Sequence, residues 1–130
     1  MVTSIDDLEA YLSRLDRKFE KVDDKTYLVG LGPNQPPAVM RVAAPVVVVQ
    51  VEVGDAPAAG APGAATLYRR LLELNSSDLL HAAYGIDGGR IVLASALELS
   101  SMDINELEAV LANIDLAVAE HVPALRELAK

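Results

Sequence analysis

Two histidines are the side chains in this sequence best suited to chemistry near neutral pH. His81 lies in a segment that we expect to be a strand, and His121 lies in the expected last helix. Neither histidine has a second histidine, a cysteine or a carboxylate at metal-ligand spacing, and the adjacent Glu120 would point to another face of the helix. We therefore expect a structural or surface role for both, with metal binding or general-base catalysis as the less favoured alternative.

The other charged pairs and the glycine cluster have ordinary structural explanations. Asp6 and Asp7 fall in the first turn of an expected helix, where acidic groups suit the positive end of the helix dipole. The glycine-rich segment 85–89 joins two strands and opens no helix, so it does not match a phosphate-binding loop. Arg69 and Arg70 fit a solvated helix face. We expect no catalytic residue, no cofactor and no metal site, and hence no enzymatic activity.

Composition points to one folded domain over residues 1–130. Apolar residues make up 52% of the chain and charged residues 23%, which argues against general disorder. The formal net charge of −8 opposes binding to nucleic acid or to an anionic membrane surface. Cysteine is absent, and the first residues carry acids where a signal peptide would carry bases, so we expect a cytoplasmic protein.

Hydrophobic periodicity indicates three helices and five strands. Apolar residues at helical spacing predict a helix from Ser4 to about Phe19, and the strongest strand pattern is the valine run that follows Pro45. A Gly/Ala/Pro stretch over about 54–63 predicts a flexible loop. The remaining expected elements are a strand starting near Lys25, one kinked strand or two strands over 38–53, a helix over 66–74, a hairpin over 79–99, and a final helix.

The hairpin and the last helix carry the most consistent local signals. Asp87, Gly88 and Gly89 are residue types that a tight hairpin turn requires, because its central positions need positive φ. Asp103 is expected to cap the last helix, and Pro123 is expected to end or kink it before Leu128. The resulting order α-β-β-β-α-β-β-α, with an antiparallel sheet packed by helices, is an α+β fold.

The helix over 66–74 carries a broader apolar stripe than one sheet face needs. It includes Leu67, Tyr68, Leu71, Leu72 and Leu74. Either the whole stripe is intramolecular core, or part of it is an interface, most simply in a two-fold homodimer.

The segment from Leu67 to Ile114 resembles the YbjN family, whose members have the type III secretion chaperone-like fold, also described as CesT/Tir chaperone-like. The resemblance is carried by the helix end LLELN, the strand around Tyr84 and Gly85, the strand from Ile91 to Leu99, and the helix entry MDINELEAVL. Over the first half of the chain only the order of elements is similar.

This resemblance implies a non-enzymatic homodimer that binds a protein chain, in a chaperone-like or regulatory role. Matching positions give the candidate dimer interface Leu67, Tyr68, Leu71, Leu72, Leu80, Ala82 and Tyr84. They give the candidate partner-binding residues Leu8, Leu12, Leu28, Val46 and Val48. The identity of the protein partner does not follow from the sequence. The alternative hypothesis is a small ligand-binding or enzymatic domain with a pocket between the sheet and the helices.

Overall fold

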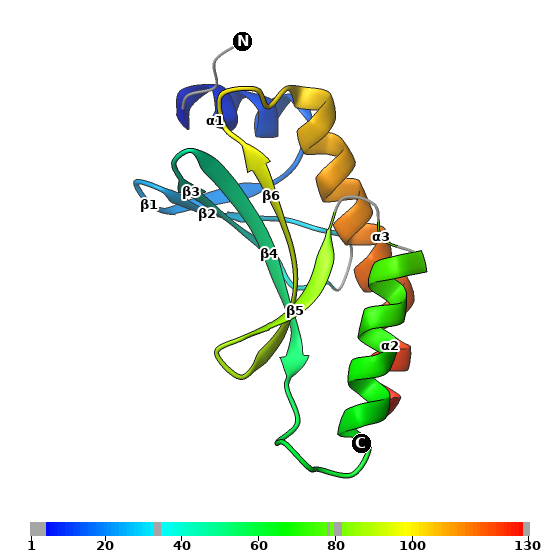
Figure 1. Cartoon of the computed structure of the whole chain (residues 1–130). Coiled ribbons are helices and arrows are strands. Elements are labelled where there is room, and N and C mark those ends of the chain that lie inside the picture. Colours follow the sequence, from blue (N-terminus) through cyan, green and yellow to red (C-terminus); the bar gives the residue numbers. More distant parts are fainter. Residues whose placement is uncertain (1–4, 33–34, 78, 80–81, 129–130) are drawn as a thin grey trace.

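The computed structural model describes residues 5–32, 35–77, 79 and 82–128, with three helices and six strands among them (Figure 1). In chain order these are α1 (Ile5–Arg14), β1 (Phe19–Asp23), β2 (Thr26–Val29), β3 (Ala38–Ala43), β4 (Val46–Asp55), α2 (Ala64–Ser77), β5 (Ala83–Asp87), β6 (Arg90–Glu98) and α3 (Ile104–Leu128). The expected α+β class is confirmed.

The six strands form one antiparallel sheet in the order β1-β2-β3-β4-β6-β5. The valine run lies in β4, which pairs with β3 on one side and with β6 on the other. The chain places β1 and β5 at the two edges. Strong β propensity and burial therefore coincide in the middle of the sheet, as expected for β-branched side chains.

One face of the sheet, here called the inner face, is buried beneath the helices. Burial alternates strictly along β3 and almost strictly along β4, so every second side chain points into the core. On β4 the core side chains are Val47, Val49, Val51 and Val53. Burying one valine side chain stabilises the fold by about 1.5–3 kcal/mol.

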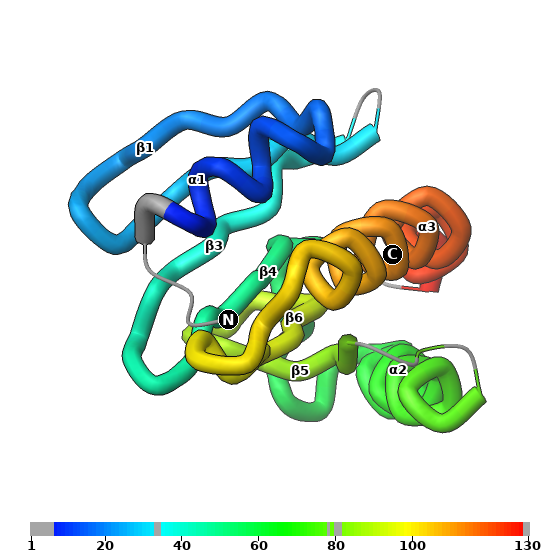
Figure 2. The backbone as a smooth tube through the Cα atoms, turned by 90° about the horizontal axis from the view of Figure 1, so that it is seen from above, coloured from blue at the N-terminus to red at the C-terminus, as the bar shows by residue number. Residues whose placement is uncertain are grey.

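All three helices contribute to the same hydrophobic core. Leu8 and Leu12 of α1 are fully buried, and α2 contributes Leu67, Leu71 and Leu74. Figure 2 shows α2 and α3 side by side and α1 next to the β1–β3 part of the sheet. The inner face is therefore covered along its length, and no described helix covers the opposite face, here called the outer face.

The α3 helix begins as the sequence predicts and ends later than its proline suggested. Asp103 Oδ1 accepts the backbone N–H of Glu106 at 2.8 Å, which is the expected cap. The helix continues through Pro123 to Leu128, so Pro123 does not end it. Leu125, two residues after the proline, is buried in the core, and this packing supports the last turns.

Several elements differ from the sequence-based expectation. The first helix ends at Arg14 and Phe19 begins β1, so the prediction of a helix to about Phe19 was wrong at its end. The strand β1 was missed because four of its five residues are exposed, which leaves no apolar alternation to detect. Of the two alternatives for residues 38–53, the structure has two strands, β3 and β4, joined by a turn at Pro45. The strand β4 extends to Asp55, two residues into the predicted loop, and α2 is longer than 66–74 at both ends. The φ angles of Gly88 and Gly89 are +57° and +79°, which confirms the tight hairpin turn.

Candidate partner-binding surfaces

The outer face of the sheet is an open and largely apolar surface. Leu28, Val39 and Val48 from three adjacent strands share this face, because the register places Leu28 opposite Val39 and both beside β4. Val39 keeps 38% of its surface exposed. The face is hollowed into a pocket of about 450 Å³ lined by Leu28, Pro36, Pro37, Val39, Arg41, Val48, Gln50, Glu52 and Asp87.

Charges on the outer face lie mainly around its apolar centre. Glu20 pairs in register with Leu28, and Glu98 pairs with Val46, so both carboxylates are on this face. The Glu52 carboxylate forms an ion pair with the Arg90 guanidinium at 3.6 Å. Arg41 lines the pocket beside Val48 and makes no ion pair within the described chain. Sequence reasoning did not single out Arg41, although a lone cation inside the apolar run VMRVA was the available signal.

The candidate partner-binding residues divide into two groups. Leu8 and Leu12 have no exposed surface and pack in the core, so they form no binding surface in this conformation. Leu28, Val46 and Val48 are half-buried and lie together on the outer face. Of the predicted partner-binding surface, only the sheet residues Leu28, Val46 and Val48 are therefore accessible, and the first helix contributes none of the candidates.

The candidate dimer residues also divide. Leu67, Leu71 and Tyr84 are buried within the chain, so their apolar surface is intramolecular core. Tyr68 and Ala82 are half-buried, and the Tyr68 hydroxyl donates to the Pro57 carbonyl at 2.9 Å. Leu72 is different, because 69% of its surface is exposed on α2. The candidate Leu80 lies outside the described residues.

A polar network closes the start of the edge strand β5. The Asn75 side chain accepts the Tyr84 backbone N–H at 2.7 Å and donates to the Tyr84 carbonyl at 3.3 Å. The Tyr84 hydroxyl contacts His121 Nδ1 at 2.8 Å, and both side chains are buried. The network ties α2 and α3 to β5, and it gives His121 a structural position of the expected kind. His81 lies outside the described residues.

The opposite edge, β1, is open to solvent. The Gly30 N–H donates to the Lys18 carbonyl at 2.8 Å, so alternation along the ladder turns the backbone groups of Phe19 and Lys21 outward. At the β1–β2 turn the Lys25 N–H donates to Asp23 Oδ1 at 2.9 Å, and this bond holds the pKa of the Asp23 carboxyl below its ordinary value of 3.8. The hydrogen bond to Asp23 thus stabilises the β1–β2 turn, while the outward backbone groups of β1 have no strand beside them within the described residues.

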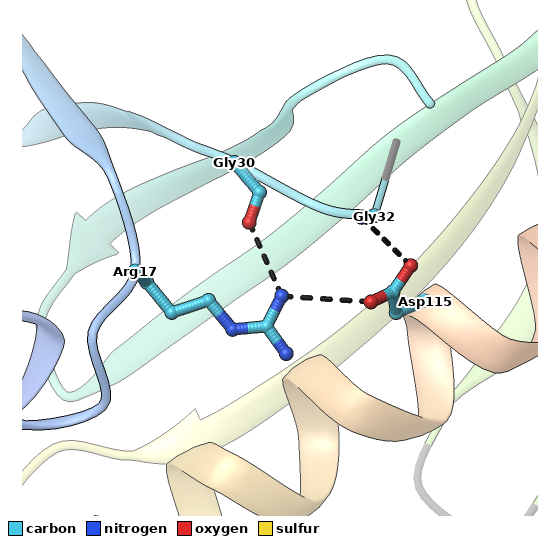
Figure 3. A network of polar contacts seen from close by, with 4 residues as sticks. All are labelled: Arg17, Gly30, Gly32 and Asp115. Atoms are coloured by element: carbon cyan, nitrogen blue, oxygen red, sulfur yellow. Dashed lines mark hydrogen bonds and ion pairs between the residues drawn. The ribbon is translucent and has the colours of Figure 1, made fainter. Parts of the chain in front are cut away.

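A second polar network joins the first part of the sheet to α3 (Figure 3). Arg17 Nη1 donates to the Gly30 carbonyl at 3.2 Å and lies 3.7 Å from Asp115 Oδ2. Asp115 Oδ1 accepts the Gly32 N–H at 2.9 Å. A Cβ at Gly32 would lie 2.8 Å from that oxygen, so a larger residue here would have to displace the Asp115 carboxylate. The network joins the segment that follows β2 to α3.

A second hollow lies near the ends of β4, α2 and α3. Its volume is about 360 Å³, and its lining is apolar apart from Asp55 and Arg126. The Asp55 carboxylate is already bonded to Arg90 at 2.6 Å. Within the described ranges no three His, Cys, Asp or Glu side chains group as a metal site. This hollow therefore offers no convergent set of reactive groups.

No described helix is long and apolar enough to cross a membrane. The last helix, α3, has 25 residues, and acidic and basic residues recur along it.

Comparisons with solved structures found similar folds in proteins of type III secretion and in YbjN. A chain of the heterodimeric ExoU–SpcU complex from Pseudomonas aeruginosa is 24% identical, with a TM-score of 0.72 over 92% of this chain and 98% of that chain. YbjN from E. coli is 15% identical, with a TM-score of 0.64 over 95% of both chains. A chain of the complex between the Yersinia pestis type III secretion chaperone SycH and a stable fragment of YscM2 is 15% identical, with a TM-score of 0.60 over 86% of this chain and 93% of that chain. At these identities the likeness shows the fold.

No curated protein sequence matches the chain. The CesT_Tir_1 family model matches residues 1–130, which is the full length of the sequence. The expected resemblance to YbjN and to the type III secretion chaperones is confirmed, and the chain belongs to the CesT_Tir_1 family.

Proposed function

We propose that this chain is a non-enzymatic, chaperone-like module that binds a protein partner through the outer face of its sheet. The observation that carries the proposal is the open apolar surface around Leu28, Val39 and Val48, with a pocket of about 450 Å³. A sheet with helices on one face only leaves such a surface in water unless a partner covers it. Polypeptide segments bind grooves of this kind through apolar side chains.

Two of the similar structures support a protein as the partner. One is the HopA1–SchA chaperone–effector complex, and another is the ExsC–ExsE complex. In both, a protein of related fold is bound to another protein chain. The same class of partner is the simplest occupant for this chain. The apolar lining of the second hollow gives no comparable support for a ligand-binding or enzymatic function.

The proposed function is tested by two matched substitutions of exposed apolar residues. Val39→Glu places a charge on the outer face, and Leu116→Glu places one on α3, where Leu116 is 57% exposed. Affinity capture from the native cell extract, followed by mass spectrometry, should recover a specific protein with the unaltered chain. We expect Val39→Glu to lose that protein and Leu116→Glu to retain it. Equal capture by both variants would remove the outer face as the binding surface.

We also propose that the chain acts as a homodimer through α2 and the β5 edge. Leu72 is the exposed apolar side chain that supports this interface, and the buried neighbours Leu67 and Leu71 hold α2 in place behind it. Size-exclusion chromatography with light scattering should report a dimer for the unaltered chain. Leu72→Glu should shift it to the monomer, while Leu116→Glu should remain dimeric. A monomer at moderate concentration before any substitution would contradict the proposal.

A further inference from the structure

The outer face differs from the sheet edges in the kind of segment that it can bind. Backbone N–H and C=O groups in the interior of the sheet are already paired with neighbouring strands, as the β3, β4 and β6 ladders show. An extended segment laid across this face would find no backbone partners, and its own polar groups would lose water. An α-helix satisfies its backbone internally. The face therefore favours a helix over a strand.

Small side chains on β5 and β6 leave room for a helix to approach closely. Ala83 and Ala94 are directly opposite each other, and Ala96 lies two residues further along β6. Gly85 belongs to the same face, and a Cβ added there would meet nothing within 4 Å. The larger Val48 on β4 borders this strip. These small side chains form a low strip along the strands, here called the channel, and Val92, opposite Gly85, is a larger side chain within it.

Carboxylates lie at both ends of this channel. Glu98 is opposite Val46 at one end, and Glu52 and Asp87 line the pocket at the other. Six residues separate Val46 from Glu52 along β4, which is about 20 Å of extended strand. A helix of about 13 residues has the same length. Basic residues at both ends of such a helix would meet the carboxylates.

The β3–β4 side of the channel carries the opposite charge near its middle. Arg41 is beside Val48 and has no ion pair within the described residues. An acidic or polar residue near the centre of a bound helix would pair with this guanidinium. At the pocket end Arg90 forms ion pairs with Glu52 at 3.6 Å and with Asp55 at 2.6 Å. Three carboxylates there share this one cation, so the charge along the strand direction is still negative, positive and negative, with the negative charge at that end partly neutralised. A complementary helix carries the reverse order.

We propose that the occupant of the outer face is an amphipathic α-helix of about 13 residues with basic residues at both ends. This inference rests on the proposed function, because it specifies the partner segment for the same surface. Apolar contact with the channel supplies most of the affinity, and the terminal charges set orientation and selectivity.

Synthetic peptides test the inference directly on the full chain. We would measure fluorescence anisotropy with three labelled amphipathic peptides: one with Lys at both ends, one with Glu at both ends, and a Lys-ended peptide interrupted by proline. The helical Lys-ended peptide should bind at least about tenfold more tightly than either of the others. Its advantage over the Glu-ended peptide should shrink in about 0.5 M salt, because salt screens exposed charges.

Two alanine substitutions locate the binding. Ala96→Arg fills the channel and adds a repelling cation, while Ala124→Arg makes the same change at an exposed position of α3. Both positions are exposed, so thermal unfolding should show both variants folded. The first variant should weaken binding of the Lys-ended peptide by at least about tenfold, and the second should leave it unchanged. Equal effects of the two variants would overturn the assignment to this face.

The other occupants give distinct results. Tight binding of the proline-interrupted peptide would indicate an extended segment, and equal binding of both charge types would exclude the electrostatic assignment. A change of oligomeric state in Ala96→Arg, without peptide binding, would identify a second copy as the occupant. Each of these results overturns the helix proposal. If the Val39→Glu variant still loses its captured partner in that case, the proposed function stands without it.

Discussion

The Asn75 side chain should hold the edge strand β5 against α2, and its removal should have a measurable cost. Asn75→Ala deletes two hydrogen bonds to the backbone of Tyr84, at 2.7 and 3.3 Å. Each such bond contributes about 0.5–1.5 kcal/mol. Because the site is only partly buried, water can hydrogen-bond to the freed Tyr84 backbone groups in the variant. We therefore expect the free energy of unfolding to fall by about 1–2 kcal/mol.

A matched substitution corrects for the intrinsic change in helix stability. Alanine is about 0.5 kcal/mol better than asparagine inside a helix, and Asn105→Ala changes an exposed helical asparagine of α3 in the same way. An unfolding entropy of about 2.1 cal/mol/K per residue then converts the difference between the two variants to about 4–7 °C in Tm. Thermal unfolding followed by circular dichroism measures it.

Hydrogen exchange gives an independent readout for the same variant. The Tyr84 amide should exchange faster in Asn75→Ala, since the Asn75 oxygen is its partner. Amides in the centre of β4 should be unaffected at low denaturant. If the two asparagine variants melt at the same temperature, and the Tyr84 amide keeps its protection, the assigned role of Asn75 is refuted.

Three further substitutions test other parts of the structure. Gly32→Ala should destabilise the chain by about 1–3 kcal/mol in urea unfolding, because its Cβ would displace the α3 carboxylate of Figure 3, whereas Gly54→Ala meets nothing within 4 Å and should be nearly neutral; equal effects would contradict the assigned contact. Leu12→Ala should cost about 2–5 kcal/mol if the residue is core, and the exposed Leu72→Ala should change monomer stability by less than about 0.5 kcal/mol; a neutral Leu12→Ala would return that residue to the candidate binding surface. Asp23, whose pKa is lowered in the folded state, contributes stability above 3.8 that is lost as the pH falls through its folded pKa, so the stability difference from Asp23→Asn should shrink between pH 7 and pH 3; a constant difference would argue against the turn hydrogen bond.

The fold class was predictable from the chain because its strongest signals are local. The valine run after Pro45, the Asp-Gly-Gly turn and the Asp103 cap each specify one conformation through short-range chemistry. The strand β1 escaped detection for the complementary reason. Its residues 20–23 are exposed, so pairing with β2 keeps it in place and burial leaves no pattern in its sequence.

The candidate surfaces depended on information that periodicity does not contain. Leu8 and Leu72 are both leucines on amphipathic helices, yet one is fully buried and the other is 69% exposed. The contacts from Arg17 to Gly30 and from Gly32 to Asp115 join residues 13 and 83 positions apart. Such contacts follow from the way the elements pack, and the local spacing of residues in the sequence does not predict them.

The amino-acid sequence by itself determined most of the elements, the acidic charge and the family resemblance. The tertiary structure decided which apolar residues remain available for binding. It moved Leu8 and Leu12 into the core and gathered Leu28, Val46 and Val48 on an open sheet face. The physical reason is that a side chain's own hydrophobicity sets how much it gains from burial, while the packing of distant elements determines whether anything in the same chain is there to bury it.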